Sequence, residues 1–268
     1  MVVYLRQLLL GALAGAGIVA GQSSPAPVRI VLVGDSTVAI KNGWGPGFCA
    51  RAASEVECIN RARNGRSSGS YRAEGLWDGV MEELRKPADK TWVLIQFGHN
   101  DQPGKPGRST DLKTEFPANL RRYVEEARGA GANPVLVTPL TRRTFRNGKV
   151  ADDLGPWSDA ARRVAKEAGV PLLDLNAESL AAVQTMGGRE ANTLAMAPPP
   201  KVVEDGDPDN SVAAPKAEPN TAEPNGETPP VFDYTHLGPK GSAYFGAMVW
   251  RELTAAVPAL IPYLKPQH

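Results

Sequence analysis

The chain contains few of the residues that bind metals or form crosslinks. Its 268 residues include two cysteines and three histidines. Cys49 and Cys58 lack the C-x-x-C spacing of structural zinc sites, so we expect no metal site. In an oxidising compartment the pair would close a short disulfide loop. Alternatively, both thiols pack as small buried apolar groups.

The chain also lacks an excess of charge of either sign. It has 30 Lys and Arg residues against 29 Asp and Glu residues, a formal net charge of +1. Such a balance provides neither a basic stripe for nucleic acid nor an acidic field for cations. We therefore expect no nucleic-acid partner, and we expect a monomer.

No hydrophobic run near the N-terminus is long enough for a typical membrane span. The apolar run from Leu8 to Ala20 is shorter than the roughly 20 residues that cross a bilayer. With Arg6 before it and small residues after it, this segment is typical of a secretory signal peptide at 1–21, a retained anchor being the alternative. We expect a secreted protein, extracellular or periplasmic, whose mature domain comprises 22–268.

Short apolar segments alternate with longer stretches of helical periodicity. The strand candidates are Val28–Val33, Val56–Ile59, Trp92–Phe97, Pro134–Val137 and Val170–Leu173. Apolar residues from Phe116 to Ala127 recur at intervals of three and four, and a last helix is expected from about Pro239 to Thr254. This alternation predicts an α/β fold with a parallel sheet of about five strands covered by helices on both faces.

The composition changes between about Gly187 and Pro230. Pro, Ala, Glu, Asp and Asn dominate this segment, and aromatic residues are almost absent. Such a composition buries too little apolar surface to offset its ordering entropy. We predict a disordered or loosely packed insertion, an ordered lid being the alternative.

Ser36 immediately follows the first predicted strand, in the segment VLVGDSTVA. Gly34 permits a tight turn there, and Asp35 is suited to cap the turn that follows. Helix capping alone explains an Asp-Ser pair at this place equally well. A serine nucleophile also needs a base and a carboxylate that orients the base. Asp233 and His236, three residues apart, supply both on one turn.

Two other loops after predicted strands contain donors for a developing oxyanion. Gly65 follows the second strand and allows close approach of its backbone N–H, and Asn100 follows the third and offers a side-chain amide. The alternative is that both are ordinary Gly/Asn turns. His99, beside Asn100, is interpreted either as orienting the site or as a structural histidine.

The ordered motifs GDST, N-x-A-x-x-G, GHND and D-x-T-H resemble the four blocks of the SGNH, or GDSL, hydrolase superfamily. Within it, NGRSSGSYRAEGLW, FGHND and DYTHLGPKG are similar to rhamnogalacturonan acetylesterases and their bacterial relatives. The resemblance implies a flavodoxin-like three-layer α/β/α sandwich without metal or organic cofactor. It also implies Ser36 as nucleophile, His236 as base and Asp233 as its orienting acid. Ser36, Gly65 and Asn100 would form the oxyanion hole.

The implied substrate is an acetylated plant cell-wall polysaccharide, most directly the pectin rhamnogalacturonan. Arg142, Arg143 and Arg146 follow the fourth strand and are candidates to face galacturonate carboxylates, although a solvated basic loop is the commoner meaning of such a cluster. Two other functions stay open. One is an esterase for acetylxylan, another acylated carbohydrate or a lipid ester, and the other is a non-catalytic carbohydrate-binding module on the same fold.

Overall fold

The computed structural model describes residues 28–213 and 231–265, and a five-stranded parallel sheet forms its centre. The strand order is β2-β1-β3-β4-β7. The strands are β1 (Val28–Gly34), β2 (Val56–Asn60), β3 (Thr91–Gln96), β4 (Asn133–Val137) and β7 (Leu172–Leu173). Each lies within two residues of a predicted strand at both ends. The prediction of an α/β fold with a parallel sheet of about five strands is confirmed.

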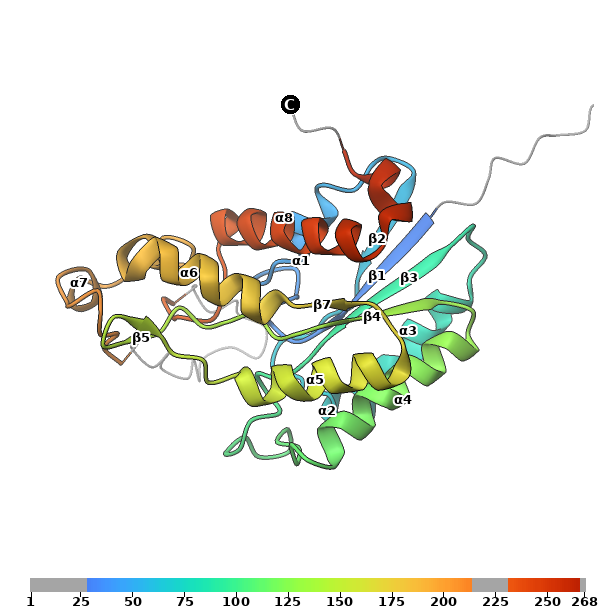
Figure 1. The fold of residues 1–268 in the computed structure, drawn as a ribbon, viewed down its shortest axis with the longest axis horizontal. Coiled ribbons are helices and arrows are strands. Elements are labelled where there is room, and N and C mark those ends of the chain that lie inside the picture. The colour runs from blue at the N-terminus through green and yellow to red at the C-terminus, as the bar shows by residue number, and fades with distance from the viewer. Residues whose placement is uncertain (1–27, 214–230, 266–268) are drawn as a thin grey trace, which may run out of the picture.

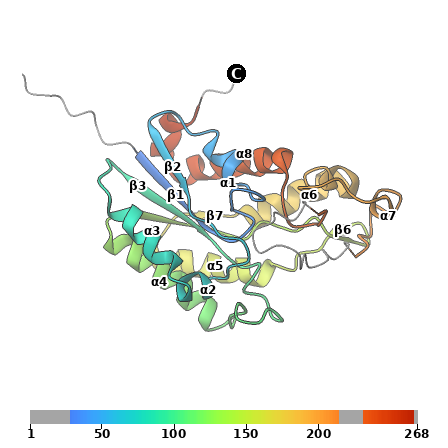
Figure 2. The same ribbon diagram turned by 180° about the vertical axis from the view of Figure 1, so that it is seen from behind.

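Helices cover both faces of the sheet, which gives three layers (Figure 1). One face carries α1 (Gly45–Cys49), α6 (Leu175–Asn192) and α8 (Pro239–Ala256), and the other carries α3 (Leu76–Arg85), α4 (Glu115–Gly129) and α5 (Gly155–Ala168). The view from behind shows the same two layers with the short helix α2 (Ser70–Ala73) beside α3 (Figure 2). Two apolar clusters fill the spaces between these layers.

The central strands are almost entirely apolar because both of their faces are covered; the polar exceptions are Arg29 in β1 and Thr91 and Gln96 in β3. Every residue of β1 is buried, and β3 is buried at all positions except Trp92. Alternate residues of β1 enter different clusters: Ile30 and Leu32 face α8, whereas Val31 and Val33 face α3 and α4. Continuous apolar strands of this kind are typical of parallel sheets buried on both sides.

The segment from 187 to 213 differs from the predicted loose insertion. Helix α6 extends to Asn192 with a break at Gly187, and α7 (Lys201–Glu204) follows. The end of the segment is held by the hairpin of β5 (Phe145–Arg146) and β6 (Lys149–Val150), because Ser211 N–H donates to Phe145 O at 3.0 Å. Composition does not reveal such long-range backbone bonds. Residues 214–230 of the predicted insertion lie outside the described residues.

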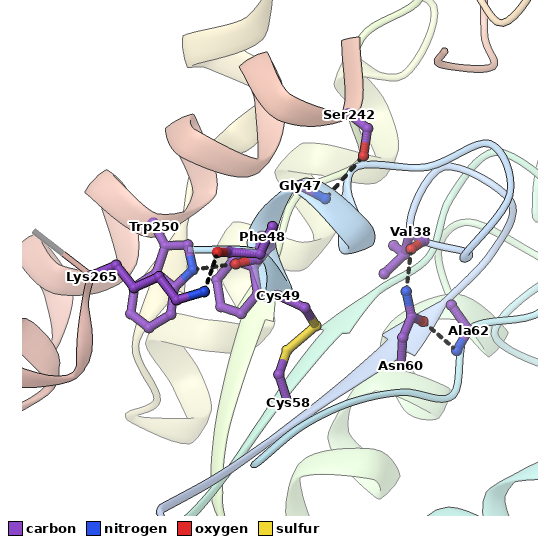
Figure 3. The surroundings of a disulfide bond; sticks show 11 residues. Val38, Gly47, Phe48, Cys49, Cys58, Asn60, Ala62, Ser242, Trp250 and Lys265 are labelled. Carbon is purple, nitrogen blue, oxygen red and sulfur yellow. Dashed lines mark hydrogen bonds between the residues drawn. A yellow bond between two sulfur atoms is a disulfide. The ribbon is translucent and has the colours of Figure 1, made fainter. Parts of the chain in front are cut away.

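Cys49 and Cys58 form a disulfide between the end of α1 and β2 (Figure 3). Their Cα atoms are 5.5 Å apart, and of the two sequence interpretations the crosslink is the one observed. Helix α1 is also held on α8, where Trp250 Nε1 donates to Phe48 O at 2.6 Å and the two rings stack at 4.6 Å. The disulfide therefore joins the α1–α8 layer to the edge strand of the sheet.

We expect Cys49→Ala/Cys58→Ala to lower the free energy of unfolding by about 2–3 kcal/mol, because the disulfide restricts a short loop of the unfolded chain. Urea unfolding of the double variant and of the parent protein with its disulfide intact measures this change. The activity of the folded variant should stay close to that of the parent protein, since the disulfide joins α1 to the edge strand β2 and is not part of the site around Ser36. Equal stabilities would contradict the expectation.

In the part of the chain that the model covers, no helix is long and apolar enough to cross a membrane. The predicted signal peptide, residues 1–21, lies outside the described residues and stays a prediction.

Candidate active site

The site lies at the carboxyl edge of the sheet, around the turn that follows β1. Gly34 ends this strand where space is short, because a Cβ there would lie 2.5 Å from the carbonyl oxygen of Gln96 and 2.7 Å from Val38 Cγ2. The next residue, Asp35, is fully buried, and its Oδ1 accepts the N–H and hydroxyl of Thr37 at 2.8 and 2.7 Å. These bonds close a tight turn that presents Ser36 at the edge of the sheet.

The hydroxyl of Ser36 contacts an imidazole that comes from the far end of the chain. His236 Nε2 lies 2.9 Å from Ser36 Oγ, and His236 Nδ1 lies 2.6 Å from Asp233 Oδ2. The structure therefore brings together the three predicted catalytic residues in the order hydroxyl, imidazole, carboxylate. This order is the one that proton transfer from a serine nucleophile requires.

Asp233 also forms the turn that carries His236. Its Oδ1 accepts the backbone N–H groups of Thr235 and His236 at 2.7 and 2.6 Å, while Oδ2 faces the imidazole. Partial burial acts to raise the pKa of Asp233, but the hydrogen bonds and charge of His236 outweigh it and hold that pKa at about 2. The carboxylate is therefore ionised at neutral pH and suited to fix the imidazole with its proton on Nδ1.

The predicted oxyanion donors lie on the loops after β2 and β3, the two strands beside β1. Gly65 has a φ of +75°, and Asn100 Nδ2 donates to Arg66 O at 3.2 Å, so the two loops touch. Among the residues that the structure describes, no recorded hydrogen bond uses the backbone N–H of Ser36 or of Gly65. These N–H groups are thus available to a bound anion.

A buried carboxylate that the sequence analysis did not single out joins the two oxyanion loops. Asp101 is fully buried and accepts from Ser68 N–H at 3.0 Å, from Ser68 Oγ at 2.5 Å and from Thr110 Oγ1 at 2.9 Å. Burial raises its pKa to about 6, against the lowering effect of these bonds. Because this value lies above that of the unfolded chain, the contribution of Asp101 to stability is present at low pH and is lost as pH rises through about 6.

A second buried network lies beneath Ser36. Trp44 Nε1 donates to Gln96 Oε1 at 2.9 Å, and Gln96 Nε2 donates to Thr37 Oγ1 at 2.6 Å. On the other side of the turn, His99 Nδ1 lies 3.5 Å from Asp35 Oδ2, and burial lowers the pKa of His99. His99 is only 2% exposed, which fits a structural histidine better than one that touches substrate.

The three arginines after β4 form neither the candidate carboxylate-binding cluster nor a wholly solvated basic loop. Arg143 is completely buried, and Arg142 forms an ion pair with Asp153, so only Arg146 is exposed. Trp44 and Trp77 are core residues with exposures of 1% and 3%, so neither offers a ring face for stacking on a sugar. A run of basic residues in the sequence does not reveal that its middle member points into the protein.

The arrangement brings a serine hydroxyl, an imidazole, a carboxylate and candidate oxyanion donors together from protein groups alone. Among the described residues, no group of three or more His, Cys, Asp or Glu side chains is placed to hold a metal ion. A serine hydroxyl activated by an imidazole performs acyl transfer through a covalent acyl-serine intermediate.

Replacing Asn100 by alanine is expected to lower kcat for ester hydrolysis about 10²–10³-fold, because one oxyanion donor is lost. KM should change little, since the donor binds charge that develops only in the transition state. Steady-state kinetics on a soluble acetyl ester measures the effect, with Asn133→Ala, at the amino end of β4, as an amide-removing control. A kcat for Asn100→Ala equal to that of the control would remove Asn100 from the oxyanion hole.

The sequence matches the model of the GDSL-like lipase/acylhydrolase family over residues 32–243. The rhamnogalacturonan acetylesterase RhgT of Bacillus subtilis is 36% identical over 176 residues, covering 63% of this chain and 73% of that protein. The probable rhamnogalacturonan acetylesterase YesY of the same organism is 34% identical over 175 residues, covering 63% of this chain and 79% of that protein.

Among solved structures, the crystal structure of protein YXIM from Bacillus subtilis superimposes with a TM-score of 0.63 at 21% identity. The match covers 86% of this chain and 57% of that one. At this identity the likeness concerns the fold alone, and it agrees with the three-layer arrangement described above.

Proposed function

The chain belongs to the GDSL-like lipase/acylhydrolase family, and on that premise we propose that it is a secreted serine esterase that removes acetyl groups from rhamnogalacturonan. The observation that carries the proposal is the contact of His236 Nε2 with Ser36 Oγ at 2.9 Å, backed by Asp233 at 2.6 Å from Nδ1. The similarity to RhgT and YesY supports a carbohydrate acetylesterase. That the substrate is rhamnogalacturonan and that the protein is secreted are proposed in addition.

In the proposed reaction Ser36 Oγ attacks the ester carbonyl while His236 takes the hydroxyl proton. The N–H groups of Ser36 and Gly65 and the amide of Asn100 stabilise the tetrahedral oxyanion. His236 then protonates the sugar oxygen as its bond to the carbonyl carbon breaks, so the sugar leaves with a free hydroxyl and acetyl-Ser36 remains. Water, deprotonated by His236, attacks this ester, so acetate is released and Ser36 regains its proton.

Basic side chains beside the oxyanion loops support an acidic glycan as the substrate. Arg108 is exposed and its Nη1 lies 3.4 Å from Gly65 O, so this guanidinium stands directly beside a predicted oxyanion donor. Arg63 is exposed two positions before Gly65. Among the described residues, neither arginine forms an ion pair with a carboxylate. Guanidinium groups are suited to the carboxylates of galacturonate units next to the acetylated residue.

We expect Arg108→Ala to raise KM a few-fold for acetylated rhamnogalacturonan, since an exposed charge pair contributes about 0.2–1 kcal/mol. KM for a neutral acetylated glycan should not change. Arg128→Ala is the control. Arg128 is an exposed arginine at the end of α4, at the opposite end of the sheet from the site. Equal KM values of Arg108→Ala and the control on the acidic polymer would contradict the role of this charge.

The proposed function is tested by acetate release from acetylated rhamnogalacturonan and from acetylated xylan. Release that is faster from the pectic polymer supports the proposal. Release from xylan or a small ester alone would retain the esterase chemistry and discard the pectic substrate. No release by folded protein from any ester would favour a carbohydrate-binding module. Secretion has its own test, since N-terminal sequencing of the exported protein should find a start near Gln22.

A further inference from the structure

Arg143 lies under the turn that carries Asp233 and His236, although it is far from both in the sequence. Its Nη2 donates to Asp233 O at 2.8 Å and to His236 O at 3.0 Å, and its Nη1 donates to Thr235 O at 3.3 Å. The backbone N–H of Arg143 donates to Tyr234 O at 2.8 Å. One residue therefore binds the carbonyl oxygens of all four positions from 233 to 236.

The loop that carries Arg143 is itself held by helix α6. It follows β4, and Thr141 N–H donates to Ser179 Oγ in α6 at 3.1 Å. After Arg143 the chain enters β5, where Phe145 is 2% exposed. The guanidinium is thus held in place from its own side, and it supports a turn, 233–236, that belongs, like the loop of Arg143 itself, to no helix or strand.

The guanidinium is completely buried and has no carboxylate partner among the described residues within ion-pair distance. Burial of an unpaired charge is costly, so neutral donors would support the turn at a lower cost. Burial lowers the pKa of Arg143 to about 10, and the side chain stays charged at neutral pH. The negative charge of Asp233 acts in the opposite direction and favours the charged guanidinium, so the pKa of Arg143 also reports an attraction between these two groups.

We propose that Arg143 is a positioning residue of the active site, which holds the turn from 233 to 236 so that His236 Nε2 stays in reach of Ser36 Oγ. The inference rests on the proposed esterase function. Arg143 touches neither reacting atom and acts through the backbone carbonyls of Asp233, Thr235 and His236. A misplacement of about 1 Å in a reacting group lowers the rate about 10²-fold, which sets the size of the expected effect.

The test compares Arg143→Ala, Arg143→Lys and the control Arg146→Ala with the parent protein on para-nitrophenyl acetate. Arg146 is exposed, and no hydrogen bond to the 233–236 turn is recorded for it in the described part of the chain. We expect kcat of Arg143→Ala to fall about 10²-fold while KM stays near the parent value. Millimolar guanidinium should restore part of kcat in Arg143→Ala and should not raise kcat of the control.

Proton NMR gives a readout that does not depend on turnover. In the parent protein His236 Nδ1 and Asp233 Oδ2 are 2.6 Å apart. The proton between them should therefore give a strongly downfield resonance. This resonance should broaden or disappear in Arg143→Ala and persist in Arg146→Ala. If Arg143→Ala does not fold, Arg143→Lys replaces it in the test. Lysine keeps the positive charge but has only one donor nitrogen, so this variant should also lose most of kcat.

The failures of the two proposals are distinguishable. A folded parent protein that hydrolyses no ester defeats the proposed function. An active parent together with a folded Arg143→Ala or Arg143→Lys variant that keeps kcat and the downfield resonance defeats the positioning role alone. Loss of activity without rescue by guanidinium and with the resonance intact also defeats it, because the turn would then be unchanged.

Discussion

Replacing Ser36 by alanine is expected to abolish ester hydrolysis, with kcat falling about 10⁶-fold as in other enzymes of this mechanism that lose the nucleophile. The physical reason is that no other hydroxyl of the described residues is recorded on His236 Nε2. The variant should fold as the parent does, because the Asp35–Thr37 bonds that close the turn do not involve the Ser36 side chain. Acetate release and urea unfolding measure the two quantities.

Ser54→Ala is the matched control for the nucleophile. Ser54 is an exposed serine before β2, at the opposite end of the sheet from the site, and its removal should leave kcat unchanged. Burst kinetics with para-nitrophenyl acetate should detect one acyl group per active parent molecule and none in Ser36→Ala. Turnover by Ser36→Ala comparable with that of the control would rule out Ser36 as the nucleophile.

Asp233→Asn is expected to lower kcat about 10⁴-fold with little change in fold. The amide oxygen can still accept the N–H groups of Thr235 and His236, so the turn persists. Its NH₂ group would donate to His236 Nδ1 and leave the ring proton on Nε2, which faces Ser36. An imidazole in this tautomer cannot take the serine proton.

Asp233→Ala separates the tautomer effect from the turn itself. This variant loses both the imidazole contact and the two backbone bonds to Oδ1, so we expect a lower free energy of unfolding than for Asp233→Asn. His236→Ala provides the reference for complete loss of the base. Activity of Asp233→Asn close to that of the parent protein would show that the carboxylate does not orient His236.

The sequence contained enough information for the layer architecture. Strands such as β1 and β3 are short, mostly apolar runs. In the helices between strands, apolar residues recur at intervals of three and four, so the local pattern indicates both element types. The pattern did not reveal that the end of α6 and the segment up to residue 213 adopt a defined structure. That structure depends on long-range hydrogen bonds such as the one from Ser211 N–H to Phe145 O. Composition reports the apolar content of a segment and does not report its distant partners.

The chemistry was indicated in the same way, by residue types at the ends of strands. Ser36, Gly65 and Asn100 each follow a strand, and parallel strands bring such positions to one edge of a sheet. Asp101 was not singled out, because a carboxylate next to Asn100 gives no local sign that it will be buried between two loops. Its two hydrogen-bond partners, Ser68 and Thr110, become neighbours of Asp101 only when the loops pack.

By itself, therefore, the sequence determined the parallel α/β arrangement and the candidate set Ser36, Asp233 and His236. Hydrophobic periodicity and chemical type are local properties of the chain, so they can be read along it. Only the tertiary structure decided that Cys49 and Cys58 are crosslinked, that Arg143 faces backbone carbonyls rather than solvent, and that His236 reaches Ser36 at 2.9 Å. Each of these depends on the distance and direction between segments far apart in the chain, which the packing of the two helix layers on the sheet sets.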